Sequence, residues 1–436
     1  MLCCIIIAPL KVNNVNDFLS FLTSPCRSAI IAVEVIYMAE LYETPKGNRI
    51  HIGIFGRRNA GKSSIINAIT GQSLAIVSDV KGTTTDPVEK AMELLPLGPV
   101  VIIDTPGLDD VGELGSKRIE KAYQVLRKTD IALLVADAGE GLGEEENKLV
   151  EEFKARGIAY VIAYNKTDIS GARACSENAI CVSAKNGEGI GELKEMLARI
   201  VPQSEERRLI GDLLEEGDVV VLVVPIDAAA PKGRLILPQQ QTIRDVLESG
   251  ATAVVCRDTE LKQTLAGLTQ PPKLVVTDSQ AFGRVSKETP RDILMTSFSI
   301  LFARYKGELA ELIKGVKAIE NLQDGDRVLI AEGCTHHRQC GDIGSVKIPK
   351  WLEEFTGKKP VYEFASGTGF PQDLNGYKAI IHCGGCMLNE REMKFRIKTA
   401  AANGIPIVNY GILIAHVHGI LKRSLEPFEE IMNLFD

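Results

Sequence analysis

The sequence lacks long apolar runs, internal repeats and an excess of positive charge. No stretch of its 436 residues approaches the roughly 20 apolar residues that a membrane-spanning helix needs. The formal net charge of −7 argues against nucleic acid or an anionic membrane surface as the main partner. We therefore expect neither a membrane segment nor a nucleic-acid partner.

The ten cysteines do not follow the regular spacing of a small secreted disulfide scaffold. Four of them gather in the last quarter of the chain, at Cys334, Cys340, Cys383 and Cys386. Spaced thiols in a long chain favour a metal site over disulfides. We expect a cytoplasmic protein with metal-binding thiols near its C-terminus.

The length of the chain predicts several domains, about three at a typical size of roughly 150 residues each. We expect a poorly ordered extension over residues 1–47 and domains over 48–202, 210–290 and 291–436. The extension has two short apolar stretches, and no basic segment precedes the first of them. We interpret Met38 as the true start, which would leave residues 1–37 without a core of their own.

Short β-rich runs alternate with helical stretches from Arg49 onward. This alternation predicts an α/β fold whose parallel sheets are covered by helices. The charged segment Gln203–Asp218 is expected to be helical, and helices are expected from Arg291 to Glu320. The predicted strands are Ile50–Phe55, Val100–Ile103, Ile131–Ala136, Ala159–Tyr164, Val219–Pro225, Ala253–Cys256, Lys273–Val276, Arg327–Ala331, Val361–Phe364, Lys378–His382 and Ile405–Val408.

The segment Gly56–Ser63 fits the phosphate-binding pattern G-x-x-x-x-G-K-[ST]. It lies between a predicted strand and a predicted helix, which is the context such a loop requires. Glycines let backbone N–H groups close around phosphates, and the helix N-terminus adds a favourable dipole. Lys62 is expected to reach the β- and γ-phosphates, and the Ser63 hydroxyl to bind Mg²⁺.

Three further motifs complete a guanine-nucleotide site. Asp104-Thr105-Pro106-Gly107 follows a strand, so that Asp104 can hold Mg²⁺ through water and the Gly107 N–H can sense the γ-phosphate. In Asn165-Lys166-Thr167-Asp168, the carboxylate can accept both N1–H and N2–H of guanine, which adenine cannot match. Ser183-Ala184-Lys185 supplies the loop behind the base.

These motifs predict a GTPase that uses GTP and Mg²⁺. Within Gly82-Thr83-Thr84-Thr85-Asp86, spacing favours Thr84 as the switch residue that completes the Mg²⁺ shell. We expect Lys62, Thr84 and Gly107 to contribute to hydrolysis. The predicted nucleotide contacts are Gly56, Asn59, Ala60, Gly61, Lys62, Ser63, Ser64, Asp104, Asn165, Lys166, Asp168, Ser183, Ala184 and Lys185.

This domain resembles the bacterial GTPases of the Era and tRNA-modifying MnmE type, over about residues 48–202. Leu108 follows Gly107, where Ras-like proteins have a glutamine that orients water. Asn59 matches the asparagine that helps to hold K⁺ in the potassium-activated members. The resemblance implies slow intrinsic hydrolysis that K⁺ stimulates. Asp109, Asp110 and Glu113 are candidates for orienting water, although ordinary solvated loop acids fit equally well.

Cysteines and histidines are grouped in the third domain with the spacing C-x-H-x45-H-C-x2-C, which begins at Cys334 and ends at Cys386. Both groups follow predicted strands, at the edge where open α/β sheets place their ligands. Unreactive buried thiols, a structural Cys3His zinc site and an iron–sulfur cluster with three cysteine ligands are all open interpretations. The fourth ligand of a cluster would be His336, His382, Glu332 or water.

The segments Gly333–Gly344, Lys347–Pro349 and His382–Met387 resemble the FeFe-hydrogenase maturation GTPase family, as does Thr44–Arg49 ahead of the P-loop. The likeness covers about residues 40–436. It implies a GTPase domain, a dimerisation domain and a 4Fe–4S domain whose cluster ligands are Cys334, Cys383 and Cys386. It further implies a homodimeric scaffold that receives a di-iron precursor from two radical-SAM maturases and delivers it to FeFe-hydrogenase.

Two other functions fit parts of the sequence. An Era- or MnmE-like GTPase of RNA modification or ribosome assembly, with a structural metal site, fits the first domain, but no basic RNA-binding module is visible. A redox enzyme with an appended GTPase domain would need acid or base residues beside the cluster, and the sequence shows none convincingly. The maturation scaffold is the interpretation that accounts for both groups of motifs.

Overall fold

The computed structural model describes residues 44, 46–71, 87–107, 121–171, 176–202, 208–226, 235–306, 309–333, 342–367, 369–371 and 373–432. The chain divides into two compact units, Met1–Pro45 and Lys46–Asp436, and every element named below belongs to the second. Nearly all of the predicted N-terminal extension lies outside the described residues, as do Thr84, Cys334 and His336.

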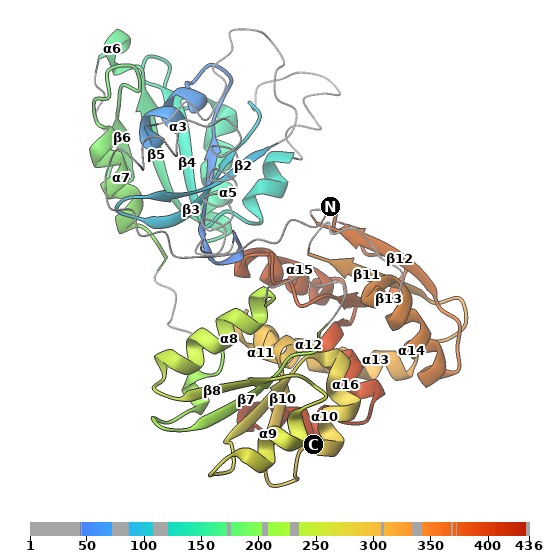
Figure 1. The fold of residues 1–436 in the computed structure, drawn as a ribbon. Coiled ribbons are helices and arrows are strands. Elements are labelled where there is room, and N and C mark those ends of the chain that lie inside the picture. Colours follow the sequence, from blue (N-terminus) through green and yellow to red (C-terminus); the bar gives the residue numbers. More distant parts are fainter. Residues whose placement is uncertain are drawn as a thin grey trace, which may run out of the picture. The chain divides into compact units, whose positions relative to one another are not determined.

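The first sheet has six strands in the order β2-β3-β1-β4-β5-β6 (Figure 1). All neighbours run parallel except β2 and β3, which are antiparallel. The strands are β1 (Ile50–Phe55), β2 (Val88–Leu94), β3 (Gly98–Asp104), β4 (Ile131–Asp137), β5 (Ala159–Asn165) and β6 (Ala179–Cys181). The helices are η1 (Lys46–Asn48), α3 (Lys62–Thr70), α5 (Glu144–Ala155), α6 (Thr167–Ser170) and α7 (Ile190–Arg199).

Alternation along these strands supplies two apolar cores, because successive side chains point to opposite faces of a sheet. Ile131 and Leu133 of β4 pack with α3 and α7, whereas Ala132 and Leu134 pack with α5 and with residues 121–126. Burial on both faces explains why β4 is apolar at six consecutive positions. The predicted strands of this domain occur within two residues of their expected ends, whereas β2 and β6 were not predicted.

The second sheet has four parallel strands in the order β10-β9-β7-β8. Its strands are β7 (Val219–Val223), β8 (Thr252–Cys256), β9 (Leu274–Thr277) and β10 (Leu294–Ser297). The helices from Gly211 to Glu320 are η2 (Gly211–Leu213), α8 (Leu237–Glu248), α9 (Leu261–Gly267), η3 (Ser279–Ala281), α10 (Phe282–Glu288), α11 (Phe298–Tyr305), α12 (Leu309–Lys314) and α13 (Val316–Glu320), of which α12 and α13 pack on the third sheet.

Two predictions in this region were wrong. Helix was expected from Arg291, but β10 forms first and extends the second sheet beyond Pro290. A strand of only four residues that is followed directly by an apolar helix has no periodicity that separates the two. Helix was also expected up to Asp218, but among residues 208–218 only the short η2 forms. The Asp245 carboxylate accepts hydrogen bonds from the Ile210 and Gly211 N–H groups and holds a turn there.

The third sheet is again parallel, in the order β12-β11-β13-β14. Its strands are β11 (Arg327–Glu332), β12 (Val361–Ser366), β13 (Tyr377–His382) and β14 (Ile407–Asn409). Its helices are η4 (Ile343–Lys347), α14 (Ile348–Thr356), α15 (Glu390–Ala402), α16 (Tyr410–Val417), α17 (Leu421–Leu425) and α18 (Glu429–Met432). The predicted α/β fold, with a P-loop domain followed by two further α/β domains, is confirmed.

One continuous core joins the second and third sheets. It runs from Leu209 to Phe428 and includes residues from both sheets. The C-terminal helices close it, since α16 packs against α11 and α17 packs against β10. No helix among the described residues has both the length and the apolar character that a bilayer crossing requires.

Gly315 provides a test of this shared core. It is buried between α12 and α13, and a Cβ atom there would lie 2.1 Å from the Ile407 carbonyl oxygen of β14. We expect Gly315→Ala to lower the free energy of unfolding by about 1–3 kcal/mol, because neither backbone can yield easily. Urea denaturation of the full chain, followed by circular dichroism, measures the change.

Gly267 at the end of α9 is the matched control. It is exposed, and a Cβ atom there would meet nothing within 4 Å. We expect Gly267→Ala to leave stability unchanged or to raise it by up to ~1 kcal/mol, because alanine restricts the unfolded chain. Equal urea midpoints for the two variants would contradict the close packing of α12 on β14.

Candidate functional site

The loop between β1 and α3 has the backbone geometry of a phosphate-binding loop. Gly56 and Gly61 have φ angles of +143° and +93°, and Asn59 lies in the left-handed region at +60°. A Cβ atom on Gly56 would lie 2.1 Å from the Val135 carbonyl oxygen. Both conformation and space therefore require glycine at position 56.

Two cations hold this loop. The Lys62 Nζ donates hydrogen bonds to the carbonyl oxygens of Gly56 at 2.9 Å and Arg57 at 2.8 Å. Arg57 in turn donates from Nε to the buried Glu146 carboxylate at 2.5 Å, which fixes the loop to α5. Arg57 was not among the predicted residues, because the motif leaves its position unspecified.

Asn165 joins the phosphate loop to the loop behind the base. Its side chain is buried at the end of β5, donates to the Ala60 carbonyl oxygen at 3.1 Å and accepts from the Ala184 N–H at 3.0 Å. A Cβ atom on Gly61 would lie 2.2 Å from the Asn165 Nδ2 atom. One amide therefore sets the distance between two loops that are more than 100 residues apart in sequence.

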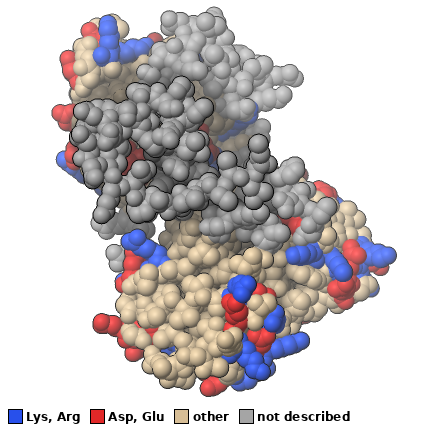
Figure 2. Space-filling view, viewed as in Figure 1, with Lys and Arg blue, Asp and Glu red and all other residues tan. Residues whose placement is uncertain are grey.

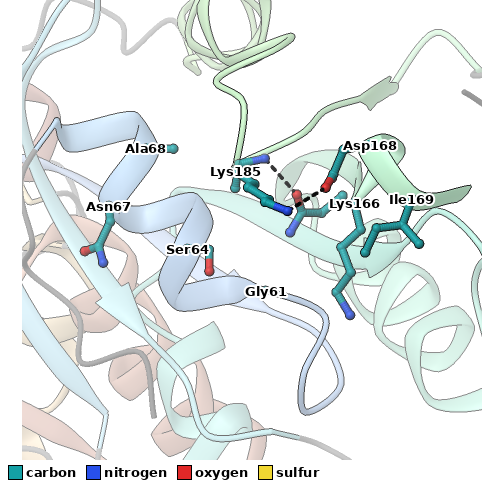
Figure 3. Close-up of a pocket in the computed structure, with 10 residues that line it drawn as sticks. Gly61, Ser64, Asn67, Ala68, Lys166, Asp168, Ile169 and Lys185 are labelled. Carbon is teal, nitrogen blue, oxygen red and sulfur yellow. Dashed lines mark hydrogen bonds and ion pairs between the residues drawn. The ribbon is translucent and has the colours of Figure 1, made fainter. Parts of the chain in front are cut away.

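The side chains expected to select guanine converge beside Asn165. The Asp168 Oδ1 atom accepts a hydrogen bond from the Ser183 hydroxyl at 2.9 Å. Its Oδ2 atom lies 3.9 Å from the Lys185 Nζ (Figure 3). Lys166 pairs with Asp137 at 2.8 Å. Burial alone would raise the pKa of Asp137, but the Lys166 hydrogen bond, the Gly139 N–H and the Lys166 and Arg57 charges lower it overall.

A cavity of about 490 Å³ opens between these loops and α3. The predicted Gly61, Ser64, Asn165, Lys166, Asp168, Ala184 and Lys185 line it. Asn67, Ala68 and Ile169 also line it and were not predicted. Helical spacing could have found Asn67 and Ala68, which lie three and four residues after Ser64 and share its face of α3.

The magnesium end of the site is described in part. Asp104 ends β3, where burial raises the pKa of its carboxyl and the Lys62 charge opposes that rise. Thr105 fixes this strand end by donating its hydroxyl to the Ile54 carbonyl oxygen at 2.6 Å. Ser63 lies in the first turn of α3, and Gly107 is the last described residue before 121. Leu108, Asp109, Asp110 and Glu113 lie outside the described residues, so their roles stay predictions.

Residues 383–388 form the cysteine loop, which begins where β13 ends beside β11. Ala331 of β11 is paired with His382 of β13, and the Cys383 N–H donates to the Ala331 carbonyl oxygen at 2.9 Å. The Gly333 N–H donates to the Cys383 Sγ at 3.0 Å. The residue just before Cys334 therefore contacts the sulfur of Cys383, although 50 residues separate them in sequence.

The loop carries two thiols, Cys383 and Cys386, which are half-buried and form no disulfide. The Cys383 Sγ accepts a second hydrogen bond from the Gly385 N–H at 3.4 Å. Gly385 has a φ angle of +61°, and a Cβ atom there would lie 2.5 Å from the Met393 Sδ. Backbone N–H groups directed at a sulfur suit a thiolate ligand, as in an iron–sulfur or a zinc site.

A buried ammonium lies beneath the same loop. Lys306, which follows α11, donates to the carbonyl oxygens of Gly385 and Leu388, both at 2.5 Å. Burial lowers the pKa of Lys306 to about 8, although the nearby Cys386, Cys383 and Glu390 raise it. The sequence analysis did not single out Lys306, because nothing local to residue 306 indicates contact with residues 385–388.

His382 is fully buried, and both of its ring nitrogens have partners. The Arg396 guanidinium donates to Nε2 at 3.0 Å, so the proton lies on Nδ1 and is donated to the Cys383 carbonyl oxygen at 2.6 Å. Burial and the Arg396 charge lower the pKa of His382 to about 3. This bonding argues against His382 as the fourth metal ligand.

Glu332 remains beside the cysteine loop as a candidate ligand. It is buried at the end of β11, and its Oε1 atom accepts a hydrogen bond from the Tyr410 hydroxyl at 3.2 Å. Burial and the nearby Cys383 and Glu332 raise the pKa of Tyr410. Among the described residues, no group of three or more His, Cys, Asp and Glu side chains could hold a metal ion. Cys334 and His336 fall outside those residues.

Three family models match the chain in succession. Residues 51–166 match a 50S ribosome-binding GTPase model. Residues 209–307 match the hydrogen maturase F dimerization domain, and residues 310–427 match the hydrogen maturase F tetramerization domain. The matched regions correspond to the three sheets described above.

Curated relatives match the first domain. The tRNA modification GTPase MnmE of Legionella pneumophila (strain Corby) is 39% identical over 153 residues, which is 34% of this chain and 34% of the relative. The enzyme of the same name from Aquifex aeolicus is 31% identical over 209 residues, 45% of this chain and 44% of that one. The chain thus spans about a third to a half of the length of these relatives.

Among solved structures, a variant of Aquifex aeolicus Era bound to GDP and tetrafluoroaluminate is 19% identical with a TM-score of 0.32, covering 48% of this chain and 92% of that one. The first domain is a GTPase domain that binds GTP with Mg²⁺, as the loop geometry and the family match together show. The prediction of GTP hydrolysis is confirmed.

Guanine selection by Asp168 can be tested by changing one oxygen. Asp168→Asn keeps an acceptor for the Ser183 hydroxyl but replaces the second carboxylate oxygen by an N–H donor. We expect GTP affinity to fall about 10- to 100-fold, since a hydrogen bond to a charged group contributes ~1.5–3 kcal/mol. Xanthosine triphosphate, which carries an oxygen in place of the guanine amino group, should bind the variant better than GTP. Calorimetric titration measures both affinities.

The control is Glu192→Gln, which removes an exposed carboxylate from α7. Its affinities for the two nucleotides should equal those of the unmodified protein. A variant at position 168 that still prefers GTP would contradict the role assigned to Asp168.

Proposed function

This chain belongs to the hydrogen maturase F family, and we propose that it carries a 4Fe–4S cluster and delivers a di-iron precursor to FeFe-hydrogenase. Family membership makes it a hydrogenase-maturation GTPase with a dimerization and a tetramerization domain. We propose the 4Fe–4S cluster, the di-iron cargo and the partner proteins. We also propose the domain limits 48–202, 210–290 and 291–436.

One contact supports the cluster most directly, the hydrogen bond from the Gly333 N–H to the Cys383 Sγ. It joins the two strand ends that carry the cysteines, so Cys334 follows immediately from a residue that already touches the loop. Cys334, Cys383 and Cys386 would hold the cluster, with His336, Glu332 or water at the fourth iron. A labile iron corner is the chemistry that such a cluster would supply to a carrier.

GTP hydrolysis by the first domain would make loading and delivery of the precursor proceed in one direction. GTP hydrolysis can bias contacts between domains or partners only if the two nucleotide states differ in those contacts. In this proposal, two radical-SAM maturases load the di-iron precursor and FeFe-hydrogenase receives it. K⁺ at Asn59 would stimulate hydrolysis in this proposal, since Asn59 lies in the phosphate loop with a left-handed backbone and an exposed side chain.

A second candidate function follows from the similarity of the first domain to tRNA modification GTPases. Those relatives extend well beyond the shared region, so their substrate does not transfer with it. On the face shown in Figure 2, Lys and Arg side chains of the described residues are interspersed with Asp and Glu. Filter binding with total RNA tests this function, since tight and salt-sensitive binding would favour it.

The metal content decides the cluster proposal. Protein purified without oxygen should contain about four irons and four sulfides per chain if one cubane is bound. We expect Cys383→Ser and Cys386→Ser each to lose most of that iron and sulfide, because each removes one ligand. Elemental analysis and electron paramagnetic resonance of the reduced protein make the measurement. One zinc per chain without sulfide would overturn the assignment.

Potassium dependence tests Asn59. Asn59→Gly keeps the left-handed backbone and removes the carboxamide oxygen, whereas Asn59→Asp retains an oxygen. We expect the glycine variant to lose about tenfold in K⁺-stimulated GTP hydrolysis, the effect of one lost ligand worth ~1.5 kcal/mol. Rates in KCl and NaCl give the comparison. Equal stimulation of all three proteins by K⁺ would remove Asn59 from the site.

A further inference from the structure

The Lys306 ammonium donates hydrogen bonds to the cysteine loop, and the proposed function assigns it no role. The residue is 4% exposed, and its two hydrogen bonds reach the Gly385 and Leu388 carbonyl oxygens. These carbonyls lie on either side of Cys386. One cation therefore fixes the backbone around the second cysteine of the loop.

The charge of Lys306 has no ordinary partner. Among the described residues, it forms no ion pair with a carboxylate, and the acidic groups that act on it are Cys386, Cys383 and Glu390. A buried charge is costly unless an opposite charge compensates it. Two thiolates bound to iron would provide that compensation at the place where the ammonium lies.

Lys306 and the cysteine loop come from different regions of the chain. Lys306 falls within residues 209–307, which match the dimerization domain, whereas the loop falls within residues 310–427, which match the tetramerization domain. The continuous core holds both in place, with Phe302 of α11 lying beneath the ammonium at 6.0 Å from its ring centre. Without the second domain, the cysteine loop would therefore lack the cation that binds its carbonyl groups.

We propose that Lys306 is a positioning residue for the cluster, which holds the cysteine loop in shape and places a positive charge beside its thiolates. This inference rests on the proposed function, in which Cys383 and Cys386 bind iron. A nearby positive charge stabilises the reduced cluster more than the oxidised one, because reduction adds negative charge. Lys306 should therefore raise the reduction potential of the cluster.

Three substitutions separate the charge from the hydrogen bonds. Lys306→Gln keeps an N–H donor for the carbonyl oxygens but removes the charge, whereas Lys306→Arg keeps the charge. Lys306→Met removes both. Lys314→Met is the control, since Lys314 lies on the adjacent α12, is largely exposed and pairs only with Glu311 among the described residues.

The experiment uses the full chain, purified and reconstituted without oxygen. Iron and sulfide per chain measure occupancy, and potentiometric titration followed by electron paramagnetic resonance measures the potential. GTP hydrolysis and elution volume report whether each variant is folded. We expect Lys306→Met to lose most of its cluster, and Lys306→Arg and Lys314→Met to keep the potential of the unmodified protein.

Lys306→Gln carries the decisive measurement. Its cluster should become harder to reduce, with about a tenfold lower ratio of reduced to oxidised protein at a fixed applied potential, which corresponds to 59 mV for a one-electron couple. A folded glutamine variant with the unmodified potential and spectrum would overturn the role of the charge. Full cluster occupancy in Lys306→Met would overturn the positioning role.

Failure of this inference is distinct from failure of the proposed function. If the unmodified protein contains no iron and sulfide, the cluster proposal itself falls, whatever the variants do. If the unmodified protein contains the cluster and all Lys306 variants match it, only the role of Lys306 is wrong.

Discussion

Parallel pairing of neighbouring strands is the constraint on which both sites depend. The register that sets Ala331 opposite His382 brings Gly333 to the Cys383 sulfur. In the first sheet, parallel pairing likewise brings the P-loop after β1, Asp104 at the end of β3 and Asn165 at the end of β5 to one edge. Parallel pairing alone brings residues that are distant in sequence together at the carboxyl ends of the strands.

Each site also contains one buried polar side chain that bridges backbone groups. Asn165 spans the phosphate loop and the loop behind the base, and Lys306 spans two carbonyl groups around Cys386. An unsatisfied amide or ammonium in the interior is costly. The loops therefore adopt the conformations that supply these partners, and the same buried groups restrict each loop to that conformation. His382 and Arg396 do the same at the end of β13.

Residues of the nucleotide-binding motifs were predictable from the sequence, because the motifs fix the spacing of Gly56, Lys62, Asn165 and Asp168. Residues whose role is set by packing were not. The edge strand β2 was missed because its interspersed charged residues leave no apolar run, and β6 and β10 because they are short. The two hydrogen bonds that occupy His382, and the reach of Lys306 to Gly385, arise from tertiary contacts that leave no local pattern.

The shared interior from Leu209 to Phe428 makes the second and third regions one cooperative body. A chain severed at residues 307–308 would leave α11 without α16 and β10 without α17, and each fragment would expose apolar surface that promotes aggregation. The residues that match the dimerization domain therefore share one core with the loop that carries Cys383 and Cys386. Because the interior is close-packed, a change of packing in the second region would be felt at the loop that carries Cys383 and Cys386.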